Sequence, residues 1–520
     1  MRAIRLAIPI ACAIGFLAMA ASASADHATR EHSQDMHALG HSPHATPFES
    51  VPPAQQNINS DIAFRGDLIF NGNYDGFRII KNSPGKPKEI SWTHCNGNQG
   101  DIVVWGNILV RAWNSPAPAD DPATPAPENR FCDGQPVPVG FEGMHIFDIS
   151  NLEDPELIGE VELSARPEAD SPGCGTHTLT AVPDEANGRL IIYNATSGGN
   201  TLLPAAEQNC DWIDIVQVPL DDPAAASHLR REPLMGGHAA HDNGVILGDA
   251  NLLATASGHM TNVFDIGENA IPGGSLEDPN LLYTIEEEGV CSIPNDPICN
   301  GNWHSAAFTW DGDVLILGWE PGGGGLGECE ATDPAVKRTA FFYDAKTGAK
   351  LGQWTLPRTQ PADQNCTIHN YNTVPLRSGK HVLVTSAYQA GTYVVDFTDP
   401  ANPEMLGYSD PAGLGQVISA QPGPDFGKPV NELGGAWSSY WYNNFIYESE
   451  ITKGLNVFRF SGPETAGAIR LPHLNPQTQE FSLGGSAAPG GSGQGQAPAG
   501  SGNGQGNGKS DQPHGKKPKD

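Results

Sequence analysis

The chain has 520 residues, of which 60 are Asp or Glu and 29 are Lys or Arg, so its formal net charge is −31. A surface this acidic repels nucleic acid and anionic lipid, and it is typical of a soluble exported protein. A cationic ligand, Ca²⁺ included, is compatible with this charge. No stretch after residue 25 approaches the roughly 20 apolar residues of a membrane span, so no span is expected.

The first 25 residues have the pattern of a secretory signal peptide. Arg2 and Arg5 precede an apolar run over residues 6–20, and Ala23-Ser24-Ala25 then offers an A-x-A cleavage site. We therefore expect a mature chain that begins near Asp26. We expect it to be secreted, either released or associated with the cell surface as a component of the cell envelope.

Two further segments lack apolar periodicity. Residues 26–50 are polar and histidine-rich, and we expect a disordered leader there that chelates transition metal loosely at most. Its histidines are His27, His32, His37, His41 and His44. Residues 466–520 are rich in Gly, Ser, Pro and Gln and end in several lysines, which predicts a flexible tail.

Residues 51–465 contain a repeat whose second half is Gly or Thr followed by alternating apolar residues and often Asp. The seven copies of this half-repeat cover residues 76–80, 143–148, 213–216, 261–265, 339–344, 392–396 and 454–458. Each unit has three or four short strand-like runs separated by turn signals, with no helical periodicity. The pattern predicts an all-β, seven-bladed β-propeller flanked by disordered N- and C-terminal tails.

The repeat resembles a known family. Residues 391–396, with Asp399-Pro400, and residues 143–149, with Asn151 and Asp154-Pro155, look like the LVIVD repeat of bacterial and archaeal extracellular proteins. The resemblance covers residues 57–463. It implies a β-propeller at or beyond the cell surface, but no single activity, because that family has none assigned.

Eight cysteines remain after the signal peptide, and an even number in an exported chain favours disulfides over metal ligation. Pairing in sequence order would close one blade or one loop per bridge, although the sequence leaves 105 connectivities open. The expected pairs are Cys95 with Cys132, Cys174 with Cys210, Cys291 with Cys299, and Cys329 with Cys366.

The first half of the repeat carries the candidate chemistry. Aligned at the residue before the first strand, the seven repeats give Ser60, Gly100, His177, His241, His304, His369 and Ser438. The four histidines are spaced 64, 63 and 65 residues apart. Because first strands surround the channel of a propeller, these four side chains should converge at one of its mouths.

Converging imidazoles stay neutral and hydrogen-bonded, or they share a cation, because protonated neighbours repel. Neutral imidazole suits Fe, Cu, Zn or Ni, and four ligands on one rim leave an open face. We therefore expect a transition-metal site, with Fe or Cu preferred and Zn possible. An inter-blade polar ring, or a ring that binds an anion or another polar ligand, stays open.

Several residues are candidates for supporting roles. Glu320 and Glu450 follow second strands and should lie near the histidines as carboxylates that orient them, unless they are solvated loop residues. His259 is a candidate fifth ligand, and His238 could replace His241. Trp437, Tyr440 and Trp441 form an aromatic cluster that either walls a pocket or packs the last blade against the first.

Two functions remain in view. One is a secreted metalloprotein, an oxidoreductase if its open coordination face turns over a small molecule. The other is a non-catalytic propeller that uses its long loops to bind a surface ligand, as an adhesion protein or scaffold. No phosphate loop, HExxH or dinucleotide fingerprint supports other enzyme classes.

Overall fold

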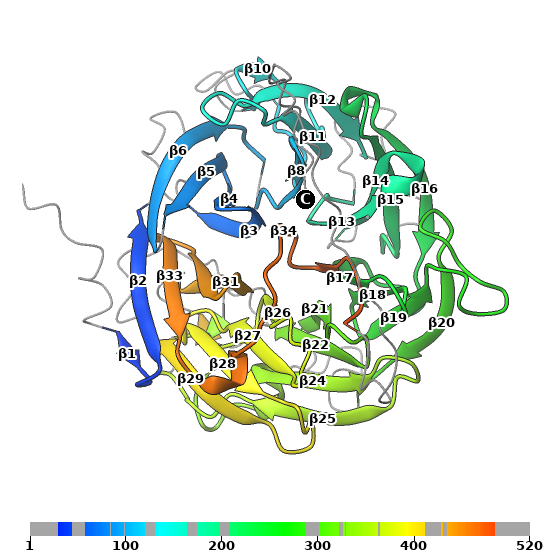
Figure 1. Ribbon diagram of the computed structural model, residues 1–520. Coiled ribbons are helices and arrows are strands. Elements are labelled where there is room, and N and C mark those ends of the chain that lie inside the picture. The colour runs from blue at the N-terminus through cyan, green and yellow to red at the C-terminus, as the bar shows by residue number, and fades with distance from the viewer. Residues whose placement is uncertain are drawn as a thin grey trace, which may run out of the picture. The chain divides into compact units, whose positions relative to one another are not determined.

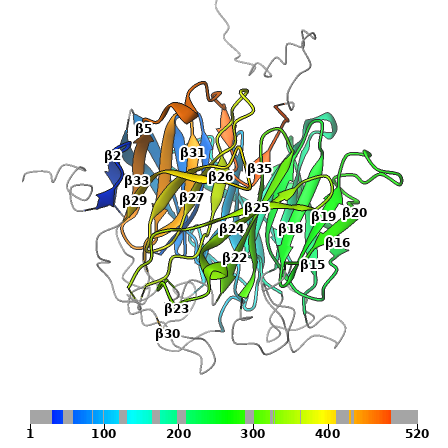
Figure 2. The same cartoon turned by 90° about the horizontal axis from the view of Figure 1, so that it is seen from below.

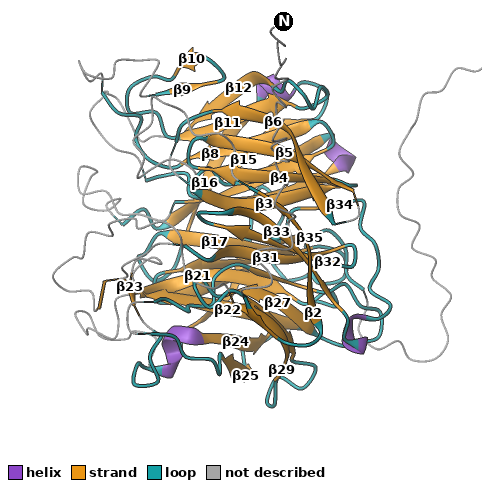
Figure 3. Ribbon diagram, turned by 90° about the vertical axis from the view of Figure 1, so that its left-hand side faces the viewer, coloured by secondary structure: helices purple, strands orange, loops and turns teal. Residues whose placement is uncertain are grey.

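The computed structural model describes residues 30–43, 58–83, 85–97, 99–119, 130–163, 174–196, 209–287, 301–321, 326–327, 329–361, 364–410, 428–429 and 434–483. Seven antiparallel sheets, the blades, are arranged around one axis (Figure 1). The described helices are short 3-10 turns, and strands dominate the view in Figure 3. The predicted all-β seven-bladed propeller is confirmed.

Blades 1 to 7 follow the chain. Blade 1 has β3 (Asn59–Arg65), β4 (Leu68–Asn73), β5 (Gly76–Ser83) and β6 (Lys86–His94). Blade 2 has β7 (Ile102–Trp105), β8 (Ile108–Trp113), β11 (Gly143–Asp148) and β12 (Glu156–Glu162). Blade 3 has β13 (Thr178–Asp184), β14 (Arg189–Ala195), β15 (Trp212–Pro219) and β16 (Ser227–Pro233). Blade 4 has β17 (Ala240–Ile246), β18 (Leu252–Ser257), β19 (Met260–Asp265) and β20 (Asn280–Ile285).

Blade 5 has β21 (Gly301–Phe308), β22 (Val314–Pro321), β24 (Thr339–Asp344) and β25 (Lys350–Thr355). Blade 6 has β26 (Tyr371–Thr373), β27 (Val382–Ser386), β28 (Thr392–Asp396) and β29 (Glu404–Asp410). Blade 7 has β31 (Ala436–Tyr442), β32 (Phe445–Glu450), β33 (Gly454–Phe460) and, from the other end of the chain, β2 (Met36–Ser42). All seven predicted half-repeats lie in third strands, and three of them match β11, β24 and β28 at both ends.

The first strands form the inner wall of the ring. β3, β7, β13, β17, β21, β26 and β31 each contact the next, and β31 contacts β3, so the ring closes. Second strands such as β4, β8 and β18 are buried along their whole length, whereas outer strands such as β12 and β25 are largely exposed or half-buried. Most of the larger apolar clusters join neighbouring blades, as between blades 5 and 6 and between blades 1 and 2. Packing between blades thus fixes where each first strand begins.

The N-terminal leader is shorter than predicted. Residues 36–42 form the outer strand of blade 7, paired with β33, and β1 (Glu31–His32) pairs with β29 of blade 6. Met36 is fully buried beside Phe458 and Phe460. The expectation of disorder over residues 26–50 is therefore wrong for residues 30–43. The physical reason is that β33 would otherwise leave an open sheet edge and an uncovered apolar face.

The predicted C-terminal boundary at residue 465 is also too early. β34 (His473–Leu474) pairs with the end of β3, and β35 (Thr478–Gln479) pairs with the end of β17. Both partners are first strands, so residues 473–479 cross the channel at the end opposite the starts of β3 and β17. The side chain of Asn475 anchors this crossing segment to the backbone of Val104 through two hydrogen bonds, of 2.8 and 3.0 Å.

Three disulfides follow the predicted sequential pairing: Cys95–Cys132, Cys174–Cys210 and Cys329–Cys366. Cys291 and Cys299 lie outside the described residues. Two small two-stranded sheets complete the fold. One is the hairpin of β9 (Phe131–Cys132) and β10 (Gln135–Pro136). The other pairs β23 (Leu326–Gly327) with the distant β30 (Lys428–Pro429) and lies beyond one face of the ring in Figure 2. Within the described ranges, no helix has the length and apolar character needed to cross a bilayer.

Candidate metal centre

The structure brings the four aligned histidines together at the start of the first strands of blades 3 to 6. Neighbouring ring centroids lie 4.3 Å apart for His177 and His241, 4.0 Å for His241 and His304, and 4.2 Å for His304 and His369. His177, His304 and His369 are buried, and His241 is partly exposed. The rings thus form an unbroken row, which is the convergence that the repeat spacing predicts.

β-Bulges aim the inner residues at the channel. The pairing of β17 with β18 skips His241, and the pairing of β21 with β22 skips His304. A bulged residue leaves the ladder, so its side chain can turn away from the sheet. The pairing of β31 with β32 skips Trp437 in the same way. Trp437, and not Ser438 as aligned from the sequence, is therefore the blade 7 counterpart of these histidines.

The residue after the aligned position joins adjacent blades. Thr178 Oγ1 donates a hydrogen bond of 2.6 Å to the backbone carbonyl of His241, and Ser305 Oγ donates one of 2.9 Å to that of His369. These bonds run from one first strand to the next at the level of the imidazoles. They fix the height of each histidine backbone along the channel and so hold the row in register.

A small cavity opens beside the row. All four histidines line it, together with the indole of Trp437. Its remaining lining is oxygen-bearing: Ser60, Asp61, Gln99, Asp101, Thr178 and Asn370. The cavity therefore has imidazoles from blades 3 to 6 and oxygen-bearing side chains mostly from blades 1 and 2, with Thr178 and Asn370 following two of the histidines.

Burial keeps the imidazoles neutral. Desolvation, together with neighbouring histidines, lowers the pKa of His177 and His304 well below the usual value. Desolvation also lowers the pKa of His241 to about 4 and that of His369 to about 3, although backbone hydrogen bonds partly oppose the shift in both. At neutral pH all four rings are unprotonated, which is the form that binds transition metals.

Glu320, at the end of β22, faces the same row. Its carboxylate oxygens lie 3.7 Å from Nε2 of His304 and 3.8 Å from Nε2 of His369, and atoms of His241, His304 and Glu320 all lie within 4.8 Å of one another. Ligands around a tetrahedral ion with bonds near 2.1 Å are separated by about 3.4 Å. The spacing is therefore close to that of a ligand set, and too long for direct hydrogen bonds.

Two neighbours orient these groups. His369 is hydrogen-bonded through Nδ1 to the carbonyl of Trp437, so Nδ1 carries the proton and the Nε2 lone pair points toward Glu320. The hydroxyl of Tyr388 donates to Oε1 of Glu320. A carbonyl behind a histidine and a donor behind a carboxylate are typical supports of metal ligands.

Unpartnered nitrogens supply the test of fit. Among the described residues, Nδ1 of His177 and Nδ1 of His304 are buried without a hydrogen-bond partner. An orphaned buried polar atom costs stability unless a ligand, ion or water satisfies it. A row of neutral histidines with one adjacent carboxylate fits a transition metal in both donor type and burial.

Other candidates lie elsewhere. Glu450 is buried, but its carboxylate accepts the backbone N–H groups of Gly435 and of the following turn, and it does not line the cavity. The rings of His238 and His259 pair with each other at 4.3 Å and are not among the cavity-lining residues. Tyr440 donates to Asp61 deeper in the channel, and Trp441 packs between blades 6 and 7. Only Trp437 of the aromatic cluster walls the cavity.

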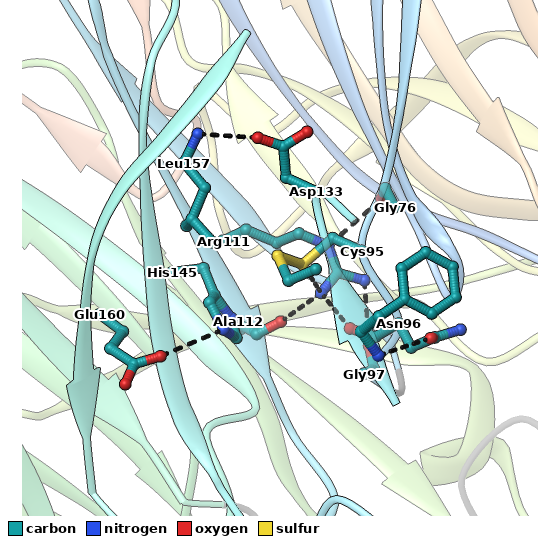
Figure 4. Close-up of a disulfide and its surroundings, with 12 residues drawn as sticks. Gly76, Cys95, Asn96, Gly97, Arg111, Ala112, Asp133, His145, Leu157 and Glu160 are labelled. Atoms are coloured by element: carbon teal, nitrogen blue, oxygen red, sulfur yellow. Dashed lines mark hydrogen bonds and ion pairs between the residues drawn. A yellow bond between two sulfur atoms is a disulfide. The ribbon is translucent and has the colours of Figure 1, made fainter. Parts of the chain in front are cut away.

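A second group with ligand-type atoms lies in blades 1 and 2. Cys95, Cys132 and His145 are close together, but the two sulfurs are joined in a disulfide (Figure 4). The buried guanidinium of Arg111 lies beside this bridge and donates to the carbonyls of Asn96, Gly97 and Ala112. Desolvation, with Arg111 adding to it, lowers the pKa of His145 to about 3. This group is a structural staple.

Sequence reasoning missed Tyr388 and Gln99. Tyr388 follows β27 in a turn with positive φ, and no repeat position marks it. Gln99 lies in the loop before β7, also with positive φ, and only its place one residue before the aligned Gly100 could have identified it.

No protein-family model matches the chain, and no curated protein matches it. The fold itself is common, since 937 solved chains match. One of them, the crystal structure of Chaetomium thermophilum Raptor, aligns with a TM-score of 0.45 and 8% identity over 84% of this chain. The alignment spans 29% of that protein. A likeness at this level carries no argument about function.

Proposed function

We propose that the protein is an exported metalloprotein in which the channel histidines hold one transition-metal ion. His241, His304, His369 and Glu320 surround the ion, and His177 continues the row beside them. Fe or Cu is the preferred metal and Zn the alternative. The single observation that carries the proposal is the row of buried neutral imidazoles at 4.0–4.3 Å spacing with Glu320 beside it.

The finer proposal is an oxidoreductase acting on a small molecule at the cavity. A bound Fe or Cu ion supplies electron transfer and Lewis acidity. The chain's own residues do the rest: the Trp437 carbonyl fixes the His369 tautomer, and Tyr388 holds Glu320 in place. Trp437 and Gln99 then form the wall against which a small ligand would be positioned.

The proposed location is outside the cytoplasm. The signal-like N-terminus, the three disulfides and the LVIVD-like repeats of residues 143–149 and 391–396 support it. On the basis of the same resemblance, we propose that the chain belongs to the LVIVD-repeat propellers.

Metal analysis of the purified mature chain tests the metal site. The leader cannot be removed to avoid adventitious binding, because residues 36–42 complete blade 7. The matched control is therefore His37→Ala, whose imidazole lies on that strand and bonds to Ser461. We expect one Fe or Cu ion per chain in the wild type and in His37→Ala. We expect its loss in His304→Ala and His241→Ala, and about 10- to 100-fold weaker binding in Glu320→Gln.

A metal-free wild type, or a His304→Ala variant that keeps its metal, would overturn the proposal. Azide then separates a reaction site from a metal that only locks the blades together. Binding of azide, seen as a new absorption band of the metal-loaded chain, shows an open coordination position. If azide does not bind to the metal-loaded chain, the result supports the non-catalytic binding propeller instead.

A further inference from the structure

A second set of residues converges on the channel one step after the aligned position. Asp61 and Asp242 follow that position in the first strands of blades 1 and 4, and Asp101 follows it directly before the first strand of blade 2. Each is at most 4% exposed. The same repeat logic that gathers the histidines therefore places carboxylates on the inner wall.

The carboxylates are unequally satisfied. Asp61 accepts hydrogen bonds from the backbone N–H of Ile62 at 2.9 Å, from Tyr440 at 2.8 Å and from Gln477 at 2.7 Å. Asp101 accepts the backbone N–H of Leu179 through Oδ2 at 2.6 Å. Its other oxygen, Oδ1, is buried without a side-chain hydrogen-bond partner among the described residues, and the adjacent backbone N–H of Ile102 also acts on this carboxyl group.

An amide oxygen in the same cavity is also orphaned. Oδ1 of Asn370 has no hydrogen-bond partner in the described part of the chain, and Asn370 is 5% exposed. Asn370 and Asp101 both line the cavity, along with Asp61. Two buried, unsatisfied oxygens facing one space indicate a missing electrophilic partner.

The charge balance of the channel points the same way. Among the described residues, no Lys or Arg lines the cavity. Burial raises the pKa of Asp61 and of Asp101, and the negative charge of Asp61 raises that of Asp101 further. Residues 473–479 cross the far end of the channel, where β34 pairs with β3 and β35 pairs with β17. Buried carboxylates without counter-charge are costly unless a cation or a proton neutralises them.

We propose that Asp61 and Asp101 bind a hard divalent cation of the Ca²⁺ type among the oxygen-bearing side chains of the cavity, separate from the imidazole row. Asn370 contributes its amide oxygen, directly or through a water. Carboxylate and amide oxygens are the ligands that Ca²⁺ prefers, whereas imidazole is a poor ligand for it. This goes beyond the transition-metal site, and the channel would then hold two cations of different chemistry.

Calcium titration of the EDTA-treated mature chain tests the site. CaCl₂ should raise the Tm of the wild type and give one binding isotherm in calorimetry. Asp101→Asn keeps an acceptor for Leu179 but removes a charge, so Ca²⁺ affinity should fall by about tenfold or more. Asn370→Asp adds a carboxylate to the same cavity and should strengthen Ca²⁺ binding. The control Asp148→Asn changes the last residue of β11, and its Tm should respond to Ca²⁺ as the wild type does.

Two outcomes overturn the proposal. The first is a wild-type Tm that does not change when Ca²⁺ is added, together with an Asp101→Asn variant that is more stable than the wild type. This result would mean that protons neutralise the carboxylates. The second is loss of the Ca²⁺ response in His304→Ala, which would place Ca²⁺ in the imidazole row. A chain that binds Ca²⁺ but no Fe or Cu would refute the transition-metal centre alone, so the two failures are distinguishable.

Discussion

Arg30 and Glu448 form an ion pair of 2.9 Å between side chains that are 2% and 0% exposed. The carboxylate of Glu448 also accepts hydrogen bonds from Thr392 at 2.6 Å and Asn456 at 2.8 Å. Arg30 belongs to the first described segment of the chain and Glu448 to β32 of the last blade. The pair therefore locks the N-terminal segment, and with it the outer strand β2, into the closed ring.

Removing Arg30 should weaken the ring strongly. In Arg30→Met, Glu448 keeps its burial but loses its cation, and breaking a buried pair from one side typically costs about 3–5 kcal/mol. Chemical denaturation of the mature chain measures this loss. Arg459→Met, which removes an exposed arginine of β33, is the matched control and should change stability by less than about 0.5 kcal/mol. Equal stability of the two variants would show that the pair does not hold the N-terminal segment.

The remaining cysteines give a covalent prediction. Three bridges join cysteines that are consecutive in sequence, which leaves Cys291 and Cys299 as the last two outside the signal peptide. We expect a fourth bridge between them. Peptide mapping of the unreduced mature chain should recover this pair, and thiol titration of the unfolded chain should find no free cysteine. Two free thiols would contradict the prediction.

Acid should weaken blades 5 and 6 through one residue. Asp311 Oδ2 lies 2.7 Å from Nε2 of His381. Burial opposes ionisation of Asp311, but the hydrogen bond and charge of His381 outweigh it and lower its pKa to about 2. A folded pKa below the unfolded value of about 3.9 means that the carboxylate stabilises the fold above pH 4. This contribution, about 2 kcal/mol, disappears as the pH falls from about 4 to about 2.

Asp311→Asn should accordingly be less stable than the wild type at pH 5, and the difference should shrink toward pH 2. Urea denaturation across this range measures it. Asp221→Asn, which changes an exposed aspartate, serves as the control and should track the wild type at every pH. If the difference in unfolding free energy between Asp311→Asn and the wild type stayed constant with pH, the interaction with His381 would not be its cause.

The repeat made the inner part of the fold predictable. Alternating apolar residues, preceded by Gly or Thr in six of the seven blades, mark the third strand of each blade. The nearly equal spacing of His177, His241, His304 and His369 placed them at equivalent points. The sequence alignment of blade 7 was wrong by one residue. A β-bulge, which sequence spacing does not show, places Trp437 and not Ser438 at the position equivalent to the histidines.

The ends of the chain were unpredictable for a different reason. Residues 36–42 form a strand only because β33 offers an edge 412 or more positions away, and their own sequence has little apolar pattern. Residues 473–479 are likewise ordered by partners in blades 1 and 4. Glu450 was assigned to the site from strand direction alone, whereas its carboxylate is used by the adjacent turn. Local sequence does not reveal such long-range partners.

Tyr388 offers the sharpest test of how the proposed centre is built. Its hydroxyl donates to Glu320, and its ring lies 4.4 Å from that of His369, so it would act on the proposed metal only through these residues. Tyr388→Phe keeps the ring and removes the donor. Because Glu320 would lose its orientation, we expect Fe or Cu affinity to fall by about 10- to 100-fold.

Stability should respond much less than affinity, since one buried hydrogen bond is worth about 1 kcal/mol. The matched control is Tyr193→Phe in blade 3, which removes a hydroxyl that donates to the carbonyl of Leu276 at 2.9 Å, away from the cavity. That variant should lose similar stability and keep full metal affinity. Competition with a chelator of known affinity measures both variants. Equal metal affinity in the two would mean that Glu320 needs no positioning residue, or that it is not a ligand.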